Sequence, residues 1–557
     1  MLRALDVLVL DCQASGATPA HGDLLELGWA VSGATELRIP PRARWIVPRT
    51  ERPISRIVRK LTGWDDACLD DAVVPEQAWA QLRTDAGAPE GTPHWAMVPT
   101  VIHFARFELP FLRELHASAS SSSSSPFPFD IVCLHAIAQR LFPDLPRRNL
   151  RALAGHLGHS PEQVRRSAGH VDATAFIWRA FLPRLEERGV RTWDELKAWL
   201  DEPAPASRAR GARPGYPLTA AQRSALPDAP GVYRFLRPNG DVLYVGKAAS
   251  LKKRVASHFK TTARATERAL EMLTQAHDVD VTVAATALEA ALLETDEIKR
   301  LDPPYNVQLR AGDRRAWFAS RDWSTAEPAP DAEHRVGPLP SRASVAGIGA
   351  MRALLGGDAP SDELRAAALG TAPRFAPPAA MFEEAWGAFV REHLTGAAPA
   401  RSRILHAAAR IVIVDEDEDD QVSGDVAEPL PESWAWDRDA VRRALERTIV
   451  QEGLLVRRAR AIALLSHAVI AFQEPRATTA RLLVVRRGEI LERADVETVE
   501  AVALRVPATP APPRAARLAA FDAALYDRLR VLGTELRRIA DQGGSVAIRI
   551  GRHVTRR

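Results

Sequence analysis

The chain has 557 residues, of which 46% are hydrophobic and 26% are charged, and its net charge is +4. This length exceeds one hydrophobic core, so we expect two or three globular domains joined by Pro- and Ala-rich linkers, while the small net charge is only weak support for a nucleic-acid partner. The three cysteines have no CxxC or Cys/His spacing and no eighteen apolar residues run together, which excludes a zinc site or disulfide framework and favours a cytoplasmic protein without a membrane partner.

The first 200 residues predict one α/β domain. The apolar stretches 5–11 and 23–31 predict two strands of a hairpin, with a Ser-Gly turn signal between them. After an apolar run that ends at residues 101–103, apolar periodicity predicts helices over residues 107–116, 131–141, 150–157 and 172–182. The serine-rich run 118–125 predicts a surface insertion.

A Pro-, Ala-, Gly- and Arg-rich linker is expected over residues 201–215, and a second domain over 216–312. The Asn239-Gly240 turn predicts a hairpin, and Thr286 with Glu289 predicts a capping box that opens a helix. The expected elements are strands over 231–236 and 242–245, helices over 251–259 and 263–276, a strand over 278–284 and a helix from 286 to about 299. This β-β-α-α-β-α order predicts a small α/β domain.

Beyond the second domain the sequence is Ala- and Pro-rich. We expect an extension with a linker over residues 313–400 and a mixed α/β region over 401–557. The elements predicted in that last region are a solvated acidic loop over 415–420, a helix over 437–465 and a hairpin over 468–489. The sequence assigns no function to this part.

The second domain holds Gly231-Val232-Tyr233, Tyr244-Val245-Gly246-Lys247 and Arg254, which follows Tyr244 by ten residues. Together these residues resemble the signature of the GIY-YIG endonucleases. Either tripeptide alone is common in hairpins, but the spacing favours a nuclease. Later residues resemble the UvrC branch of the family: 251–259 its basic helix, 287–299 the helix with its metal-binding glutamate, here Glu294, and Asn306 its active-site asparagine.

The resemblance implies a full set of groups for phosphodiester hydrolysis, which requires an activated water, positive charge beside the phosphate and a stabilised leaving oxygen. It implies that Glu294 binds one Mg²⁺ or Mn²⁺ ion, which acts as a Lewis acid. Arg254 and Lys247 would contribute positive charge around the phosphate. Tyr244 would orient or deprotonate the water, and Tyr233 would hydrogen-bond near the phosphate.

Basic residues concentrate around these motifs, because residues 247–268 hold seven Lys or Arg against a single acid. This local excess indicates a DNA-binding surface. The residues expected to contact DNA outside the motif are Lys252, Lys253, Lys260 and Arg264. For His258 we expect a core or substrate-edge position rather than a catalytic one. For Glu294, a structural ion pair with Lys299 or Arg300 is the alternative to a metal ion.

Residues 336–345, with the helix that follows to residue 355, resemble the segment after the nuclease in UvrC and in its shorter relative Cho. An alternative is that 347–353 forms the Gly-h-Gly core of a helix-hairpin-helix clamp, whose backbone amides hold a DNA phosphate. The second, ribonuclease-H-like cutting domain of UvrC is not visible in the sequence. We therefore expect a single cut per engagement.

Segments of the first domain resemble the DEDDh exonucleases of the DnaQ type. Asp11 with residues 23–28 resembles the first motif, 61–64 resemble the Thr-Gly element, and Glu108 and Asp172 lie where the second and third motifs belong. The resemblance implies a ribonuclease-H-like fold in which acidic side chains, here Asp11, Glu108 and Asp172, hold two metal ions while a histidine activates water.

Several positions depart from that pattern. Gln13 stands where the family has a second acid, Glu108 replaces the usual aspartate, and Ser167 stands where the general base belongs. His170 is nearby but would need a local rearrangement to serve. Two interpretations stay open: a weak or altered 3'-5' exonuclease and, as the favoured one, a catalytically inactive fold kept for binding DNA or a partner, because each missing metal charge weakens ion binding.

Together these features predict a metal-dependent, structure-specific DNA endonuclease that nicks damaged or branched DNA in a process like nucleotide excision repair. DNA is the expected partner, with excision-repair damage-recognition proteins or a DNA polymerase as further partners. Two alternatives remain. One is a non-catalytic DNA- or polymerase-binding accessory protein, which would bind without cutting, and the other is a mobile-element or restriction GIY-YIG nuclease that cuts a specific sequence.

Overall fold

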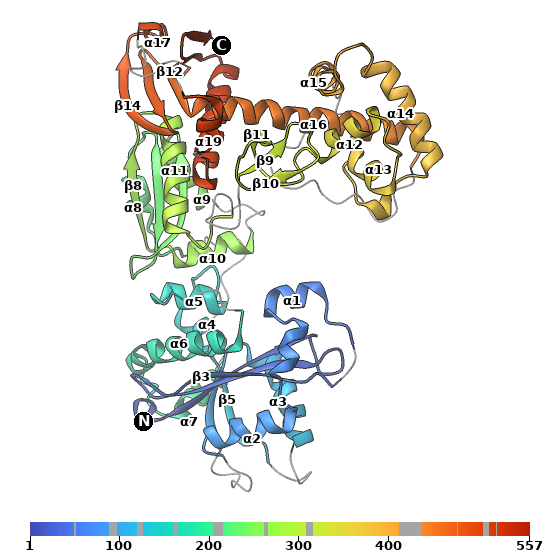
Figure 1. Cartoon of the computed structure of the whole chain (residues 1–557). Helices are drawn as coiled ribbons and strands as arrows, with labels where there is room; N and C mark the ends of the chain where they lie inside the picture. Colours follow the sequence, from blue (N-terminus) through green and yellow to red (C-terminus); the bar gives the residue numbers. More distant parts are fainter. Residues whose placement is uncertain are drawn as a thin grey trace. The chain divides into compact units, whose positions relative to one another are not determined.

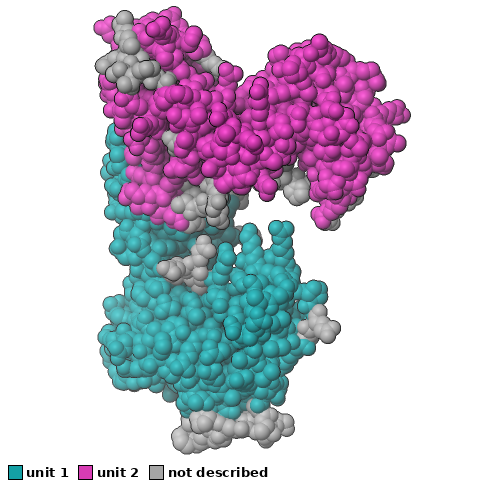
Figure 2. Space-filling model, in the orientation of Figure 1, with its two compact units in different colours: residues 1–285, 303–307 teal, residues 286–302, 308–557 magenta. Residues whose placement is uncertain are grey.

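The computed structural model divides the chain into two compact units, which Figure 2 colours separately. The first unit consists of residues 1–285 and 303–307, and the second of residues 286–302 and 308–557. The structure describes residues 1–49, 52–88, 97–119, 126–160, 165–203, 215–260, 266–307, 316–411, 436–475, 477–504, 512–519 and 521–556. Outside these ranges lie most of the serine-rich run, linker residues 204–214, Arg264 and the acidic loop 415–420.

The first fold of the first unit is built on a five-stranded mixed sheet (Figure 1). Its strands are β1 (Val7–Ala14), β2 (Leu24–Ser32), β3 (Leu37–Trp45), β4 (Val98–Ile102) and β5 (Phe129–Cys133). They lie in the order β3-β2-β1-β4-β5, in which β1, β2 and β3 pair antiparallel and β1, β4 and β5 pair parallel. Strand β1 is therefore the centre of the sheet.

Helices cover both faces of this sheet. They are α1 (Arg56–Thr62), α2 (Pro75–Asp85), α3 (Ala105–Ala119), α4 (Leu134–Leu141), α5 (Leu150–His156), α6 (Ser167–Glu187) and α7 (Trp193–Asp201). Because side chains alternate along a strand, Val7 and Val9 of β1 join an apolar cluster with α4, α5 and α6, whereas the even-numbered residues pack with α2 and α3. The odd-numbered Asp11 and Gln13 continue the face that α6 covers.

Two strands of this fold differ from the sequence prediction, which also lacks helices α1, α2 and α7. Residues 131–133, predicted as the start of a helix, belong to β5 and pair in parallel with β4. The β-branched side chains of Ile131 and Val132 suit a strand better than a helix. The sequence does not predict β3, because Pro40 and Pro41 remove two backbone donors; the strand tolerates them because it lies at the edge of the sheet.

The second fold of the first unit is a three-stranded antiparallel sheet with short helices. Its elements are α8 (Ala220–Ser224), β6 (Gly231–Leu236), β7 (Val242–Ala248), α9 (Leu251–His258), α10 (Glu267–Gln275) and β8 (Asp278–Val283). The strands lie in the order β7-β6-β8, and one apolar cluster that includes the buried Tyr233 and Phe235 joins them to α9 and α10. Helix α11 (Ala287–Leu301) completes the β-β-α-α-β-α order that the sequence predicts, and it belongs to the second unit.

The second unit contains α11 and the described elements after residue 315. Its first part holds β9 (Trp317–Ser320), β10 (Ala326–Glu327), β11 (His334–Leu339), α12 (Ala346–Leu355), α13 (Asp362–Ala368), α14 (Ala379–His393), α15 (Ala400–Arg410) and α16 (Arg438–Leu465). Its last part holds β12 (His467–Gln473), β13 (Ala480–Arg486), β14 (Glu489–Val496), α17 (Ala501–Leu504), α18 (Arg514–Leu518), α19 (Ala523–Asp541), β15 (Ser545–Ile550) and β16 (His553–Arg556).

The last five strands form an antiparallel sheet in the order β14-β13-β12-β15-β16. Helices α11, α16 and α19 share one apolar cluster with this sheet, to which Leu292, Ile462 and Leu532 belong. The predicted helix 437–465 and hairpin 468–489 are thus present, as α16 and as β12 with β13. Among the described residues, none of the helices combines the length and the apolarity that crossing a bilayer requires.

The alternative of a helix-hairpin-helix clamp at residues 347–353 is wrong. The amides of Gly347 and Ile348, at the start of α12, donate to the two carboxylate oxygens of Glu452 on α16, at 3.1 and 2.8 Å. Burial raises the pKa of Glu452 to about 7. Because these amides already have an internal acceptor, they are not available to a DNA phosphate. In addition, residues 340–345 form bends and turns instead of the preceding helix of such a clamp.

Candidate active site

Two tyrosines face one another across the first hairpin of the three-stranded sheet. Strands β6 and β7 pair with Tyr233 opposite Gly246 and with Phe235 opposite Tyr244. Tyr233 and Tyr244 therefore occupy diagonal positions on one face, and their ring centroids are 6.0 Å apart. Tyr233 is fully buried, whereas Tyr244 is partly exposed. The fold thus brings together the two tyrosines that the motif singles out.

Gly246 makes room for the hydroxyl group of Tyr233. A Cβ atom at this position would lie 2.5 Å from Tyr233 Oη and 2.7 Å from Cε1 of Tyr244, which is closer than non-bonded atoms approach. Steric crowding therefore requires glycine at this position of the Tyr-x-Gly motif, because a larger residue would displace one of the two phenol rings.

The hydroxyl group of Tyr233 lies 2.6 Å from Nε2 of His258, at the end of α9. Burial, and then the nearby Arg254, lowers the pKa of His258 to about 4, so the imidazole is neutral at pH 7. In the tautomer that carries its hydrogen on Nδ1, Nε2 accepts the phenol hydrogen and leaves the oxygen of Tyr233 as an acceptor. The sequence expectation for His258, a core or substrate-edge position, did not anticipate this bond to a motif tyrosine.

The basic segment, which we define as residues 247–260, carries five exposed cations: Lys247, Lys252, Lys253, Arg254 and Lys260. Helix α9 starts where Ser250 accepts a hydrogen bond from the amide of Lys253, at 3.3 Å. Lys253 also pairs with Asp228 at 3.7 Å, but both side chains are mostly exposed, so this ion pair contributes little to stability. The segment thus presents positive charge to solvent next to the two tyrosines.

Asn306 holds the outer edge of β7. Its Oδ1 accepts from the amide of Val245 at 3.0 Å, and its Nδ2 donates to the carbonyl of Val245 at 2.9 Å. The amide of Tyr305 donates to the carbonyl of Leu243 at 3.1 Å. Residues 305 and 306 therefore bind β7 on both sides of Tyr244, and Asn306, which is 6% exposed, acts on the site through the strand.

Glu294 lies on α11 in the second unit, and its side chain is partly buried. Thr286 caps this helix by accepting from the amide of Glu289 at 3.1 Å, which is one half of the predicted capping box. The carboxylate of Glu289 bonds to an arginine of β13. Lys299, the alternative ion-pair partner of Glu294, lies 2.7 Å from Asp527.

Two of the three predicted acidic site residues of the first fold lie in a buried polar cluster. Asp11 and Glu108 are 8% and 4% exposed, and Glu108 accepts from the amide of Cys12 at 2.9 Å. Burial, followed by the charge of Asp11, raises the pKa of Glu108 well above its usual value. His170 Nδ1 lies 3.0 Å from Asp11 Oδ1. The histidine therefore reaches this cluster without the local rearrangement that its sequence position suggests.

Asp172 lies on a different side of α6 from His170, because residues two apart on a helix project about 200° from each other. Its carboxylate is 3.4 Å from Nε2 of His159, and that imidazole lowers the pKa of Asp172. Gln13 donates to a backbone carbonyl at 2.6 Å. In the described part of the chain, Gln13 Oε1 and Asp11 Oδ2 are buried without a hydrogen-bond partner.

The two folds differ in how well their residues fit metal ions. Within the described ranges, no group of three His, Cys, Asp or Glu side chains is arranged to hold a metal ion. A two-ion centre needs several carboxylates, and the first fold offers Asp11 and Glu108, with the third acid paired elsewhere. A single Mg²⁺ ion keeps several waters and needs only one or two carboxylates, and the acid of the endonuclease motif is the partly buried Glu294.

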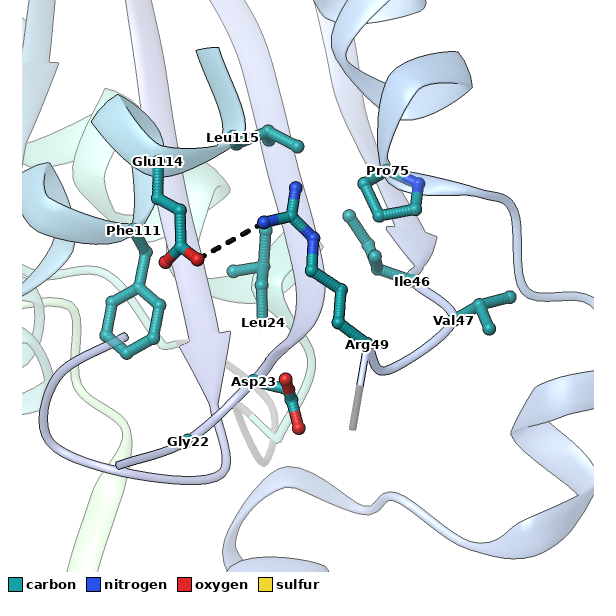
Figure 3. A pocket seen from close by; sticks show the side chains of 10 residues that line it. All are labelled: Gly22, Asp23, Leu24, Ile46, Val47, Arg49, Pro75, Phe111, Glu114 and Leu115. Atoms are coloured by element: carbon teal, nitrogen blue, oxygen red, sulfur yellow. Dashed lines mark hydrogen bonds and ion pairs between the residues drawn. The ribbon is translucent and has the colours of Figure 1, made fainter. Parts of the chain in front are cut away.

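A separate pocket lies in the first fold. Figure 3 shows its lining, which includes Asp23, Arg49 and Glu114, and its volume is about 30 Å³. Arg49 Nη1 and Glu114 Oε1 form an ion pair at 3.2 Å there.

The second fold is similar to nuclease domains of known proteins. Residues 229–307 match the UvrC-like GIY-YIG domain. A Mycobacterium tuberculosis (strain CDC 1551 / Oshkosh) protein named as a bifunctional exonuclease/endonuclease is 31% identical over 259 residues, which are 45% of this chain and 38% of that protein. UvrABC system protein C of Alkalilimnicola ehrlichii is 52% identical over 94 residues, 17% of this chain and 15% of that protein.

A solved structure, the GIY-YIG N-terminal endonuclease domain of UvrC from Thermotoga maritima bound to magnesium, is 32% identical. The match covers 16% of this chain and 93% of that domain, with a TM-score of 0.15. The matches cover 38% and 15% of the lengths of the two relatives above, so this chain is similar to only a part of each relative.

Proposed function

We propose that this chain, whose residues 229–307 form a UvrC-like GIY-YIG domain, is a metal-dependent, structure-specific DNA endonuclease. The observation that carries the proposal is the pair Tyr233 and Tyr244 beside the exposed basic segment. Hydrolysis of a phosphodiester needs a positioned water and positive charge at the phosphate, and this arrangement offers groups for both. We further propose that the DNA it nicks is damaged or branched, in a process like nucleotide excision repair.

The residues of the hairpin and α9 have distinct proposed roles. Tyr244, the partly exposed phenol, orients or deprotonates the attacking water. Tyr233 accepts a hydrogen bond near the phosphate when its own hydrogen is donated to the Nδ1-protonated tautomer of His258. Arg254 and Lys247 stabilise the negative charge that develops on the phosphate, the first through a planar fork and the second as a point charge.

Glu294 is the proposed ligand of one Mg²⁺ or Mn²⁺ ion, because its carboxylate supplies the hard oxygen that either ion prefers. The similar domain of Thermotoga maritima UvrC is bound to magnesium. Such an ion supplies Lewis-acid stabilisation of the leaving oxygen. Asn306 contributes by holding Val245, and with it Tyr244, through its two hydrogen bonds to β7.

The basic segment is the proposed contact with the DNA backbone. Lys252, Lys253 and Lys260 are exposed there, and Arg264 extends the segment in the sequence. Cations that neutralise phosphates release counterions, so the affinity for DNA is expected to fall with salt concentration. Because the domain is UvrC-like, we propose excision-repair damage-recognition proteins, or a DNA polymerase, as its protein partners in the cytoplasm.

We propose that the first fold is catalytically inactive and binds DNA or a partner. Its cluster has a neutral amide, Gln13, where a charge would help to hold an ion. Asp172 pairs with His159 instead. The relative named as an exonuclease/endonuclease favours the alternative of a weak exonuclease, which shortening of 3'-labelled single strands in Mg²⁺ or Mn²⁺ would reveal.

The test of the endonuclease proposal is nicking of lesion-bearing, branched and random duplexes by the full chain with Mg²⁺ or Mn²⁺. Glu294→Ala is expected to lower the nicking rate by at least about 100-fold. Asp296→Ala is the matched control, since this carboxylate is on the same helix and pairs with Arg528 at 2.9 Å. The control variant should cut at close to the parent rate.

Three outcomes would contradict the proposal in different ways. Equal cutting by the parent and by Glu294→Ala means that the metal ligand is misassigned. Binding without cutting under either ion means that the chain is an accessory protein. Cutting at one sequence in random duplex, without preference for lesions or branches, means that it resembles a restriction or mobile-element nuclease.

A further inference from the structure

The two folds of the first unit meet in a polar interface between α5 and α10. Gly155 on α5 faces Gln275 on α10, and a Cβ atom at Gly155 would lie 1.9 Å from Gln275 Oε1. A glycine therefore permits the close approach of the helices. At a more exposed position of the same interface, Arg147 forms an ion pair with Glu267. These contacts join the first fold, which we call the exonuclease-like fold, directly to the second, which we call the endonuclease fold.

The carboxylate of Glu271 on α10 binds groups from both folds. From the exonuclease-like fold, Asn149 Nδ2 donates to Glu271 Oε2 at 2.7 Å, and Arg151 Nε lies 3.5 Å from Oε1. From the endonuclease fold, the hydroxyl group of Tyr305 donates to Oε1 at 2.6 Å. The side chain of Glu271 is 13% exposed, so water screens these contacts less than it screens a surface ion pair.

Tyr305 is held by several groups at once. Two guanidinium groups lie over its ring: that of Arg151, 5.5 Å from the centroid, and that of Arg268, 5.2 Å from it. Its hydroxyl group donates to Glu271 and accepts from Gln275. Burial, and then the charge of Glu271, raises the pKa of Tyr305 well above its usual value, so the phenol keeps its hydrogen. One of these contacts, that of Arg151, comes from the exonuclease-like fold.

Tyr305 leads directly to the candidate active site, because the next residue is Asn306. Strand β7 lies at the edge of its sheet, and residues 305 and 306 bind its outer side. Their bonds to Leu243 and Val245 flank Tyr244. A displacement of the Tyr305 ring would therefore move the peptide that keeps Tyr244 in position.

We propose that the exonuclease-like fold positions Tyr244 of the endonuclease site by holding Tyr305 through Glu271. The inference rests on the endonuclease function proposed above. It gives the exonuclease-like fold a role that needs neither a metal ion nor a catalytic residue of its own. Asn149 and Arg151 are positioning residues in this scheme, since they act through the endonuclease fold.

Asn149→Asp is the substitution that interrupts this link with little other change. Asn149 caps α5 by accepting from the amide of Ala152 at 2.9 Å, and aspartate keeps that cap. The substitution also replaces the amide nitrogen that donates to Glu271 by a carboxylate oxygen, so two carboxylates then face each other. In the full chain, kcat for nicking is expected to fall about tenfold while KM for DNA changes less than about twofold, because the basic segment is untouched.

A compensating change and a control make the test specific. Adding Glu271→Gln exchanges the roles of donor and acceptor, because the glutamine amide donates to the new carboxylate while its oxygen accepts from Tyr305. The double variant is expected to regain most of the lost kcat. Arg147→Gln is the matched control, since it removes an ion pair of the same interface that does not involve Glu271, and it should leave kcat unchanged.

Hydrogen exchange tests the inference without any cleavage. The amides of Val245 and Tyr305 donate the hydrogen bonds that hold β7 on either side of Tyr244, to Asn306 and Leu243 respectively. Asn149→Asp should accelerate their exchange about tenfold, and Arg147→Gln should not. Unchanged exchange in Asn149→Asp, or equal acceleration in the control, would overturn the positioning role. A parent chain that never cuts DNA would refute the endonuclease proposal instead, and the exchange result would still decide this one.

Discussion

In the endonuclease fold the basic residues of the motif face solvent, whereas in the exonuclease-like fold two of the three acidic motif residues, Asp11 and Glu108, are buried. Lys247 and Arg254 are exposed, and the histidine that supports Tyr233 is neutral. Asp11 and Glu108 are 8% and 4% exposed, and the pKa of Glu108 is strongly raised. A phosphate that approaches from solvent meets the exposed cations first, whereas burial of an acid favours its neutral form. The charged motif residues therefore have different environments in the two folds.

The two folds also differ in how their motif residues are held. Tyr233, Tyr244 and Arg254 come from one hairpin and the helix that follows it, so short-range geometry brings them together. Asp11, Glu108 and Asp172 come from elements far apart in the chain, and one of the three has a different partner. The first arrangement therefore depends on short-range contacts, and the second on contacts between elements distant in the sequence.

The largest effect is expected at the exposed cation Arg254. Arg254→Ala should lower kcat for nicking about 100- to 1,000-fold, because the guanidinium stabilises charge that develops at the phosphate. Lys253→Ala on the same helix is the matched control, with an exposed ion pair that contributes little. It should weaken DNA binding mildly and leave kcat near the parent value. Equal losses in both variants, measured by single-turnover kinetics, would show that the segment only binds DNA.

An intermediate effect is expected from pH, through His258. Its pKa is about 4 in the folded chain, below its ordinary value near 6.5, so between these values the unfolded chain binds a proton that the folded chain does not. Its contribution to stability is thus fully present above about pH 6.5 and is lost as the pH falls toward 4, by at most about 1.4 kcal/mol per pH unit.

The measurement is urea unfolding of the full chain at a series of pH values. His258→Gln should reduce the loss of stability between pH 6.5 and 4, because glutamine does not titrate there. Ser257→Ala, at an exposed position of the same helix, should keep the slope of the parent. A slope that His258→Gln does not change would mean that the imidazole is protonated in the folded chain.

The smallest effect is expected in the exonuclease-like fold. Because burial already favours the neutral form of Glu108, Glu108→Gln should change the free energy of unfolding by less than about 1 kcal/mol and leave nicking unchanged. Chemical denaturation and the nicking assay measure the two quantities. Loss of a 3'-5' exonuclease activity in this variant would contradict the proposal that the fold is inactive.

Short-range patterns in the sequence predict much of the endonuclease fold. The hairpin at Asn239-Gly240, its strands β6 and β7 and the basic helix α9 all lie where the turn residues and the apolar pattern of the sequence predict them. The misassignment of residues 131–133 and the absence of β3 from the prediction have one cause. Both strands are defined by pairing with neighbours distant in the sequence, which short-range periodicity does not report.

By itself, the sequence determined the hairpin and helix that carry Tyr233, Tyr244 and Arg254, because turn chemistry and period-two alternation act over a few residues. Only the tertiary structure decided the partners that come from afar: Asn306 on Val245, across 61 residues, and Asn149 on Glu271, across 122. Such contacts form where packing brings buried polar groups within reach of one another, and each group takes the partner that leaves the fewest of them unpaired.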